Sequence, residues 1–385
     1  MLKTIIVLSD GTEIASGVGV IPNIRKCKIN SMTNSGQELV FGSVCSSFVE
    51  LTIFCPGGNL GITAGTRFDL YKEKPDGTQK KIGVFNAEKP TRPSANLYKI
   101  TAYDNVSKLD KDLTAFLRQF LDGRESTEPL FSEMEYFAAR ICIACGLDYK
   151  NSGVLPNRDL AIPQFPADGQ TGRLLMQWIG ECAGRFCRAD ENGEIEFAQY
   201  TETGITIRPS GELYYLSGSL QYEDYTVAPV DGLIFWFYDW VIPEANNPYT
   251  IAQSNLIWSG RGGRAVSWEQ DYRLQEETLL TEMKAIGAYT PCRLTIPARL
   301  DVRAGDIITV VTQEGKALRV LVMSATMDGQ RLTLECTGSA SRSGSSATYS
   351  GNVGGGSSEA EILSKLGAEW ITIDGRQVLA KKEKA

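Results

Sequence analysis

Cysteine is the residue type whose spacing could best support chemistry in this 385-residue chain. Cys142 and Cys145 form a CxxC pair, and Cys182 and Cys187 follow farther along. Four thiolates at such positions would make a structural zinc site. Both pairs lie in apolar stretches with helical periodicity, where a free cysteine is usually a small core residue. We therefore expect no metal at these cysteines, and a zinc site is the alternative left open.

The chain contains no histidine. Ser-His-Asp and Cys-His catalysis, histidine-ligated metals and the usual general base near neutral pH are therefore excluded. Two carboxylates could still hydrolyse a glycosidic bond, but the 46 Asp and Glu residues include no pair that the pattern singles out. We predict that the chain is not an enzyme and that it uses no cofactor.

Two other segments could bind a ligand. The aromatic run from Leu233 to Trp240 could stack sugars, which makes a carbohydrate-binding or carbohydrate-active β-rich protein the alternative function. The run is continuous instead of alternating with polar residues, so a buried strand is the preferred interpretation. The cluster from Gly260 to Arg264 resembles an anion-binding nest only weakly, because no phosphate-loop context surrounds it.

Composition places the chain among soluble proteins with large cores. The 39 Lys and Arg residues against 46 Asp and Glu give a net charge of −7 without a basic stripe, so we expect no sequence-specific nucleic-acid binding. No apolar run approaches the roughly 20 residues of a membrane helix, so no membrane anchor is expected. The odd number of cysteines, nine, favours a reducing compartment, and we expect synthesis in the cytoplasm.

The elements that must position these residues begin with a β pattern that occurs twice. Each copy has Ala-Gly, an alternating strand, a turn ending in Gly and a return strand, and each is followed by one more alternating strand. We expect the first copy to have a turn two residues longer than the second. The first copy comprises Ala64-Gly65, Phe68, Leu70, Asp76-Gly77, Ile82 and Val84, followed by Tyr98 to Tyr103; the second comprises Ala304-Gly305, Ile307 to Val311, Glu314-Gly315, Leu318, Val320 and Val322, followed by Arg331 to Cys336.

Helical periodicity appears between the two copies. One apolar stripe over four turns, from Val106 to Leu121, predicts a single helix that Gly123 ends. A second helix is predicted to start at Ser132, with Glu135 completing a capping box. A third begins at Thr171 and runs into a hairpin turned by Asn192-Gly193.

The predicted fold class is α+β and β-rich, with two related tube-like β-barrels and an inserted α+β domain. Near the C-terminus a Gly/Ser tether with a reach of roughly 25 Å precedes a miniature hairpin, which is too small to be stable alone in water. Its apolar residues are the predicted partner-docking site: Trp370, Ile371, Ile373, Val378 and Leu379. The predicted division is 1–105 first barrel, 106–204 inserted domain, 205–340 second barrel with one helix, 341–358 linker and 359–385 docking segment.

Three strings of this chain resemble the bacteriophage tail hub family, the baseplate or tail-tip hub proteins. The resemblance covers residues 1–340 by order and spacing. The strings are YKITAYDNVSKLDKDLTAFL (Tyr98 to Leu117), TGRLLMQWIGECAGRFCRADENGEIEF (Thr171 to Phe197) and VRAGDIITVVTQEG (Val302 to Gly315).

The resemblance implies a homotrimer in which two tail-tube-like barrels per chain form a pseudo-sixfold ring. Such a hub is a structural adaptor between the sixfold tail tube and the threefold tip, without catalytic residues. Its implied partners are a tail tube or distal tail protein, a tip, spike or fibre protein, and a tape-measure protein. The implied location is the tip or baseplate of the virion tail, after assembly in the host bacterial cytoplasm. A generic β scaffold of a surface or secretion machine is a third interpretation.

Overall fold

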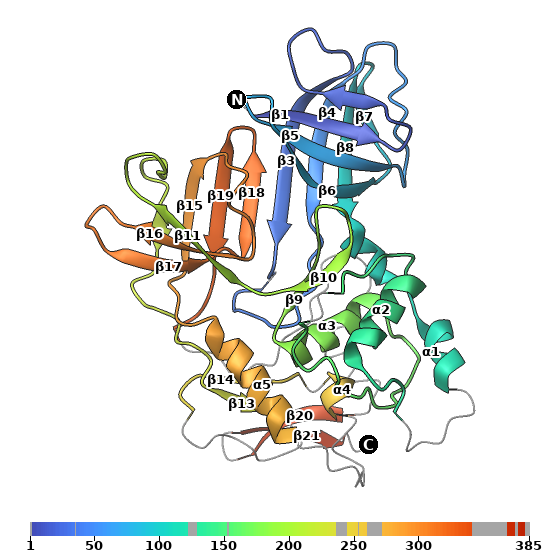
Figure 1. Ribbon diagram of the computed structural model, residues 1–385, viewed down its shortest axis with the longest axis vertical. Helices are drawn as coiled ribbons and strands as arrows, with labels where there is room; N and C mark the ends of the chain where they lie inside the picture. The colour runs from blue at the N-terminus through green and yellow to red at the C-terminus, as the bar shows by residue number, and fades with distance from the viewer. Residues whose placement is uncertain are drawn as a thin grey trace.

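The computed structural model describes residues 2–34, 36–121, 129–151, 154–235, 245–252, 254–259, 272–340, 368–373 and 376–381 (Figure 1). The predicted Gly/Ser linker 341–358, the cluster 260–264 and the aromatic residues 236–240 lie outside them. Within the described residues, no helix is both long and apolar enough to cross a membrane.

The N-terminal β unit is a closed barrel. Its path β3-β2-β1-β5-β6-β8-β4 joins seven strands, and the pairing of β4 with β3 closes it. Strand β7 pairs with β8 outside this path. The strands are β1 Lys3–Leu8, β2 Glu13–Ala15, β3 Asn23–Met32, β4 Phe48–Phe54, β5 Arg67–Glu73, β6 Gln79–Ala87, β7 Thr91–Ser94 and β8 Leu97–Asp104.

Alternation along the strands builds the barrel core. In β5 the buried positions are Phe68, Leu70 and Lys72, with partly or fully exposed residues between them. Lys72 is 2% exposed, and its ammonium group donates to Thr4 Oγ1 at 2.8 Å, so this inward-facing side chain has a hydrogen-bond acceptor. The β-rich α+β fold class is confirmed, and the first expected barrel is a closed one.

Within the described residues, the helical insert contains four helical segments and one hairpin. In Figure 1 these helices lie together below the barrel, on the side to which β8 leads. The elements are the 3-10 helix η1 Asn105–Asp110, α1 Thr114–Leu121, α2 Met134–Ala144, α3 Gly172–Ala183, and the paired strands β9 Phe186–Ala189 and β10 Ile195–Ala198.

The single helix predicted from Val106 to Leu121 is wrong, because the chain breaks between η1 and α1. Lys111 is extended, and Asp112 forms an isolated bridge with Thr171. The Asp112 carboxylate then accepts from Thr114 N at 2.7 Å and so provides a fresh cap for α1. The apolar stripe continues across the break, which is why the periodicity concealed it.

The predicted capping box of the second helix is also wrong. α2 is preceded by Glu133, whose side chain makes no capping hydrogen bond, and Glu135 is buried and ion-paired with Arg158 at 3.4 Å. The predictions for the third helix are confirmed. Thr171 Oγ1 caps α3 by accepting from Leu174 N at 3.2 Å, and β9 and β10 form the expected hairpin.

The second β unit has two sheets. The ladder β12-β15-β19-β18 continues into β3 of the barrel, and β11-β16-β17 form a separate sheet that lies across the ends of the first in Figure 1. The strands are β11 Thr201–Ile207, β12 Gln221–Tyr222, β15 Cys292–Pro297, β16 Asp306–Val311, β17 Ala317–Leu321, β18 Ser324–Asp328 and β19 Arg331–Cys336.

Four elements lie between β12 and β15 in the described chain, and three of them contact α3 of the insert. They are β13 Gly232–Ile234, β14 Pro248–Thr250, α4 Leu256–Ser259 and α5 Tyr272–Ala285. Arg185, just after α3, pairs with Glu282 of α5 at 2.7 Å. Buried Glu181 of α3 accepts from Tyr249 Oη at 3.2 Å and from Asn255 Nδ2 at 2.8 Å. The carboxylate therefore anchors this later segment to the insert.

The expected C-terminal hairpin is present. β20 Ala368–Ile373 pairs in antiparallel fashion with β21 Arg376–Lys381, and within the described chain these two strands pair only with each other.

Candidate functional site

The two copies of the β pattern agree at the level of individual backbone hydrogen bonds. Gly65 and Gly305 both have positive φ, 82° and 97°, where a side chain would be strained. Each glycine lies just before an outgoing strand and donates to a residue at the end of the return strand or directly after it. The matched bonds are Gly65 N to Ala87 O (2.7 Å) and Ala87 N to Thr66 O (2.9 Å) in the first copy, and Gly305 N to Val322 O (2.8 Å) and Val322 N to Asp306 O (2.8 Å) in the second.

The turns of the two copies are the same, which corrects the expected longer first turn. Lys74 N donates to Thr78 O at 2.9 Å, and Thr312 N donates to Lys316 O at 2.8 Å, so each turn closes over the same number of residues. The extra length of the first copy lies in its strands, since β5 and β6 are longer than β16 and β17 and contain a bulge after Leu70.

The duplication extends through the next hairpin. Glu88 N donates to Thr101 O at 2.8 Å, and Met323 N donates to Glu335 O at 2.9 Å. β7 then pairs with β8 as β18 pairs with β19, with a two-residue turn in each case. The residues that flank the turns are Ser94 and Leu97 in the first copy and Asp328 and Arg331 in the second.

The two β units are joined by direct strand pairing. β18 lies antiparallel to β3, with Thr326 opposite Asn30, and Asn30 Nδ2 donates to Thr326 Oγ1 at 2.8 Å. Because this pairing continues the sheet from one unit into the other, it holds two similar units side by side in one chain.

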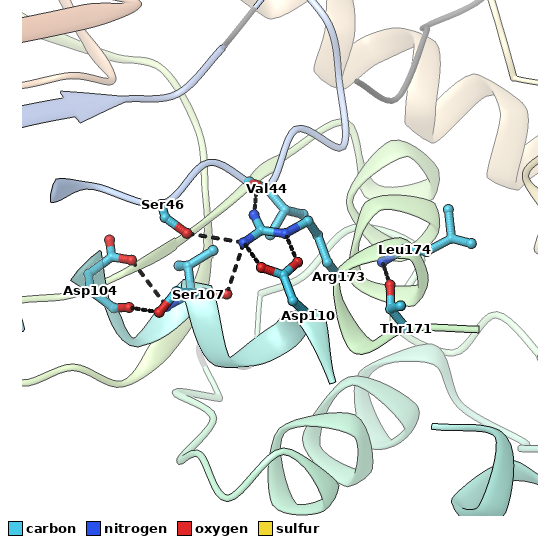
Figure 2. A network of polar contacts seen from close by, with 9 residues as sticks. Val44, Ser46, Asp104, Ser107, Asp110, Thr171, Arg173 and Leu174 are labelled. Carbon is cyan, nitrogen blue, oxygen red and sulfur yellow. Dashed lines mark hydrogen bonds and ion pairs between the residues drawn. The ribbon is translucent and has the colours of Figure 1, made fainter. Parts of the chain in front are cut away.

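A buried arginine holds the barrel against the insert (Figure 2). Arg173 of α3 donates two hydrogen bonds to the Asp110 carboxylate, from Nε to Oδ1 at 2.5 Å and from Nη2 to Oδ2 at 3.1 Å. It also donates to Val44 O, to Ser46 Oγ at 3.1 Å and to Val106 O at 3.3 Å. One side chain therefore joins the β3–β4 loop, η1 and α3, which fixes where the insert sits.

Asp104 completes this polar junction where β8 becomes η1. Its carboxylate accepts from Ser47 N at 2.8 Å and from Val106 N at 3.1 Å. Burial raises the pKa of Asp104 from 3.8 to about 7, because desolvation outweighs these hydrogen bonds and the attraction of nearby Arg173. The junction therefore contains a group that titrates near neutral pH.

The four cysteines considered for zinc do not form a metal site. Across the described residues, no three His, Cys, Asp or Glu side chains are placed to hold a metal ion. Cys142 and Cys182 are buried on α2 and α3. Burial raises the thiol pKa of Cys142 to about 12 and of Cys145 to about 11, so both are held as neutral core thiols.

The start of the aromatic run is buried. Leu233 and Phe235 are 3% and 6% exposed, and the Phe235 ring packs edge-on against Trp258 at 5.2 Å between centroids. These two positions agree with a buried segment, and the Phe235 ring offers no open face for stacking a sugar.

The structure brings the predicted docking residues into one hairpin. Trp370 is the backbone partner of Leu379, and Ile371 is the partner of Val378, while Ile373 lies opposite Arg376. Their role in docking stays a prediction.

Sequence reasoning missed the polar junction. A signal was present, because Arg173 stands near the start of a largely apolar helix, but its partners lie 63 residues or more away in the chain. Hydrophobic periodicity identifies the buried face of a helix, but it does not identify the residues that this face contacts.

Comparison with known proteins identifies the fold through solved structures. No protein-family model matches the chain, and no curated protein is significantly similar. The tail protein from Neisseria meningitidis MC58 superposes with a TM-score of 0.53 at 12% identity, covering 88% of this chain and 96% of that one. The 43 kDa tail protein of prophage MuSo2 from Shewanella oneidensis gives 0.49 at 10% identity, covering 87% and 97%. The first likeness shows that the two chains share a fold.

Proposed function

We propose that this chain is a structural component of a bacteriophage-type tail, a trimeric adaptor between a sixfold tube and a threefold tip. The duplication carries the proposal. Two β units agree in their backbone hydrogen bonds and lie side by side through the β18–β3 pairing. Three such chains would present six similar units on one face while keeping threefold symmetry on the other.

The fold shared with the Neisseria tail protein supports the same role. The proposed partners are a tail tube or distal tail protein on the sixfold face and a tip, spike or fibre protein on the threefold face. A tape-measure protein would contact the ring during assembly in the host cytoplasm. A ring built from a chain of net charge −7 would not retain DNA by phosphate contacts.

The proposed division of labour follows the predicted domains. Residues 1–105 and 205–340 would form the ring, and residues 106–204 would form the insert that packs against it. Residues 359–385 form a docking segment for the tip or fibre protein, joined by the linker 341–358. A two-stranded hairpin is marginal in water, so docking on a partner would stabilise it.

Native mass tests the adaptor role. Sedimentation of the full chain should show a species of three times 42.2 kDa, and averaged electron-microscope images should show a ring with six similar lobes on one face. A chain that stays monomeric at its highest soluble concentration, and also when mixed with a purified tail tube protein, would overturn the proposal.

A further inference from the structure

The equivalence of the two β units identifies two strand edges with a missing neighbour. β7 occupies in the first unit the place that β18 occupies in the second, since both follow the repeated hairpin and pair with the next strand. β18 is paired on both sides, with β19 and with β3. β7 is paired only with β8 in the part of the chain described, and all four of its residues are exposed.

β15 pairs with β19 as β4 pairs with β8, so β12, the other partner of β15, is likewise the equivalent of β3. Tyr222 of β12 lies opposite Cys292 of β15, as Ile29 of β3 lies opposite Val49 of β4. β3 receives β18 on its outer edge. β12 ends the long sheet in the described chain, and both of its residues are exposed. The two free edges are thus the counterparts of the two edges that meet inside the chain.

We propose that β7 of one copy pairs with β12 of the next, in the register that β18 and β3 use within the chain. The inference rests on the proposed trimer and names the surfaces that form it. Transferring the observed register places Ser94 opposite Gln221, as Asp328 lies opposite Lys28. β7 has a bulge between Thr91 and Ser94, where three steps along β7 match two along β8, so the same register places Thr91 opposite Glu223, as Thr326 lies opposite Asn30. The Thr91 hydroxyl would then donate to the Glu223 carboxylate where Asn30 now donates to Thr326.

The charges of the two edges are complementary. Lys89, Arg92 and Lys99 are exposed on and beside β7. Glu223 and Asp224 are exposed beside β12, and neither forms an ion pair with another described residue. Opposite charges on facing strands stabilise the pairing. Like charges would face each other if a second copy approached in the wrong orientation, and they would repel it.

The hydrogen-bonding groups of the edges also match. Glu223 N donates to Pro291 O at 3.0 Å, so alternation turns the Tyr222 N–H outward, towards the proposed neighbour. On the other edge, Pro90 and Pro93 remove two donors and leave their carbonyl oxygens as acceptors. The β7 edge therefore offers backbone hydrogen-bond acceptors but few donors. This disfavours pairing between two β7 edges and favours pairing with an edge that supplies N–H donors.

The contact is head-to-tail, because β7 and β12 belong to different units of the chain. Such contacts form a ring when the rotation closes and a filament when it does not. Within the chain, β18–β3 already relates two similar units. Repeating that relation between chains closes at three copies if the ring is pseudo-sixfold.

Cysteine pairs test the register in the full-length chain. A mixture of Thr91→Cys and Glu223→Cys should give a covalent dimer on mild oxidation, and the double variant should give a ladder that ends at three chains. Thr91→Cys with Asp224→Cys is the matched control, because position 224 is one residue out of register and points to the opposite face of the strand. The wild type measures the background from its native thiols, eight of which are buried.

A charge exchange tests the same edge without new thiols. Lys89→Glu should reduce the proportion of native trimer, and Lys89→Glu with Glu223→Lys should recover it, while the melting temperature of the monomer stays unchanged. Recovery distinguishes a contact between copies from damage to folding.

The outcomes separate the inference from the proposed function. A native trimer without the 91–223 disulfide overturns the β7–β12 pairing and leaves the adaptor intact. A monomer without the disulfide overturns both. A covalent ladder that continues beyond three chains confirms the pairing and overturns the closed ring.

Discussion

A Cβ atom built on Gly180 would lie 2.9 Å from the Cα of Gly42, so the β3–β4 loop crosses helix α3 backbone against backbone. Gly42 N also donates to Arg185 O at 2.7 Å, just beyond that helix. Only glycine at both positions allows this approach. The crossing and the Arg173 junction together fix the orientation of the insert on the barrel.

Gly42→Ala should therefore destabilise the chain by about 3 kcal/mol or more, since its Cβ would lie 2.4 Å from Gln177 O and its φ is +78°. Gly11→Ala is the control, because Gly11 has a similar φ of +84° and nothing within 4 Å, so only the backbone penalty of about 1 kcal/mol applies. Urea denaturation measures both. Equal losses would mean that the close approach contributes nothing.

Arg173→Lys should lower the free energy of unfolding by about 2 kcal/mol, because one ammonium group cannot replace the forked bonds to Asp110 and the loop. Arg118→Lys should change it by less than about 0.5 kcal/mol, because the Arg118–Asp168 pair is exposed. Thermal unfolding of the two variants compares them. A result in the reverse order would contradict the role given to Arg173.

The polar junction predicts a pH dependence through Asp104. Its folded pKa is about 7 against an ordinary 3.8, so between these values the folded state keeps a proton that the unfolded state releases. This contribution to stability is complete below about pH 4 and falls as the pH rises to 7, with a slope of at most about 1.4 kcal/mol per pH unit. Asp104→Asn should remove that slope.

Asp76→Asn provides the control of opposite sign. The backbone N–H of Thr78 holds the pKa of Asp76 below its usual 3.8, so its contribution is present above that value and is lost as the pH falls through the folded pKa. Denaturant unfolding from pH 4 to 8 should show the Asp104 slope in this variant and not in Asp104→Asn. The same slope in both variants would remove Asp104 as its source.

The cysteines should behave as core residues in chemical labelling. Eight are buried and Cys45 is half-buried, so a thiol reagent at pH 8 should modify Cys45 first and the other eight only on unfolding. Cys45→Ser should abolish the fast phase. If the purified chain contained stoichiometric zinc and unfolded when a chelator removed it, the result would support the zinc-site alternative.

Deleting residues 359–385 should leave the native trimer intact and abolish capture of the tip or fibre protein. Trp370→Ala with Ile371→Ala is the finer version, because it keeps the chain length. Pull-down with the full chain and with each variant measures the loss. Undiminished capture by the truncated chain would contradict the docking role of this segment.

Local order was predictable where neighbours in sequence decide the structure. The repeated hairpin, the cap at Thr171 and the turn at Asn192-Gly193 depend on strand alternation, a capping hydroxyl and a glycine with positive φ. Each can be inferred from a few adjacent residues. The helix break at Lys111 could not, because the bridge between Asp112 and Thr171 that holds it joins residues distant in the chain.

The sequence by itself determined that this chain is β-rich, carries a duplicated β pattern around a helical insert, and lacks histidine chemistry. Only the tertiary structure decided that the duplicated units share one sheet through β18 and β3, and that Arg173 ties the insert to the barrel. Strand partners and the contacts of a buried arginine depend on long-range packing, which cannot be read from a local sequence pattern. The same packing left one edge of β7 and one edge of β12 without a partner strand in the described chain, and these edges form the surface between copies proposed above.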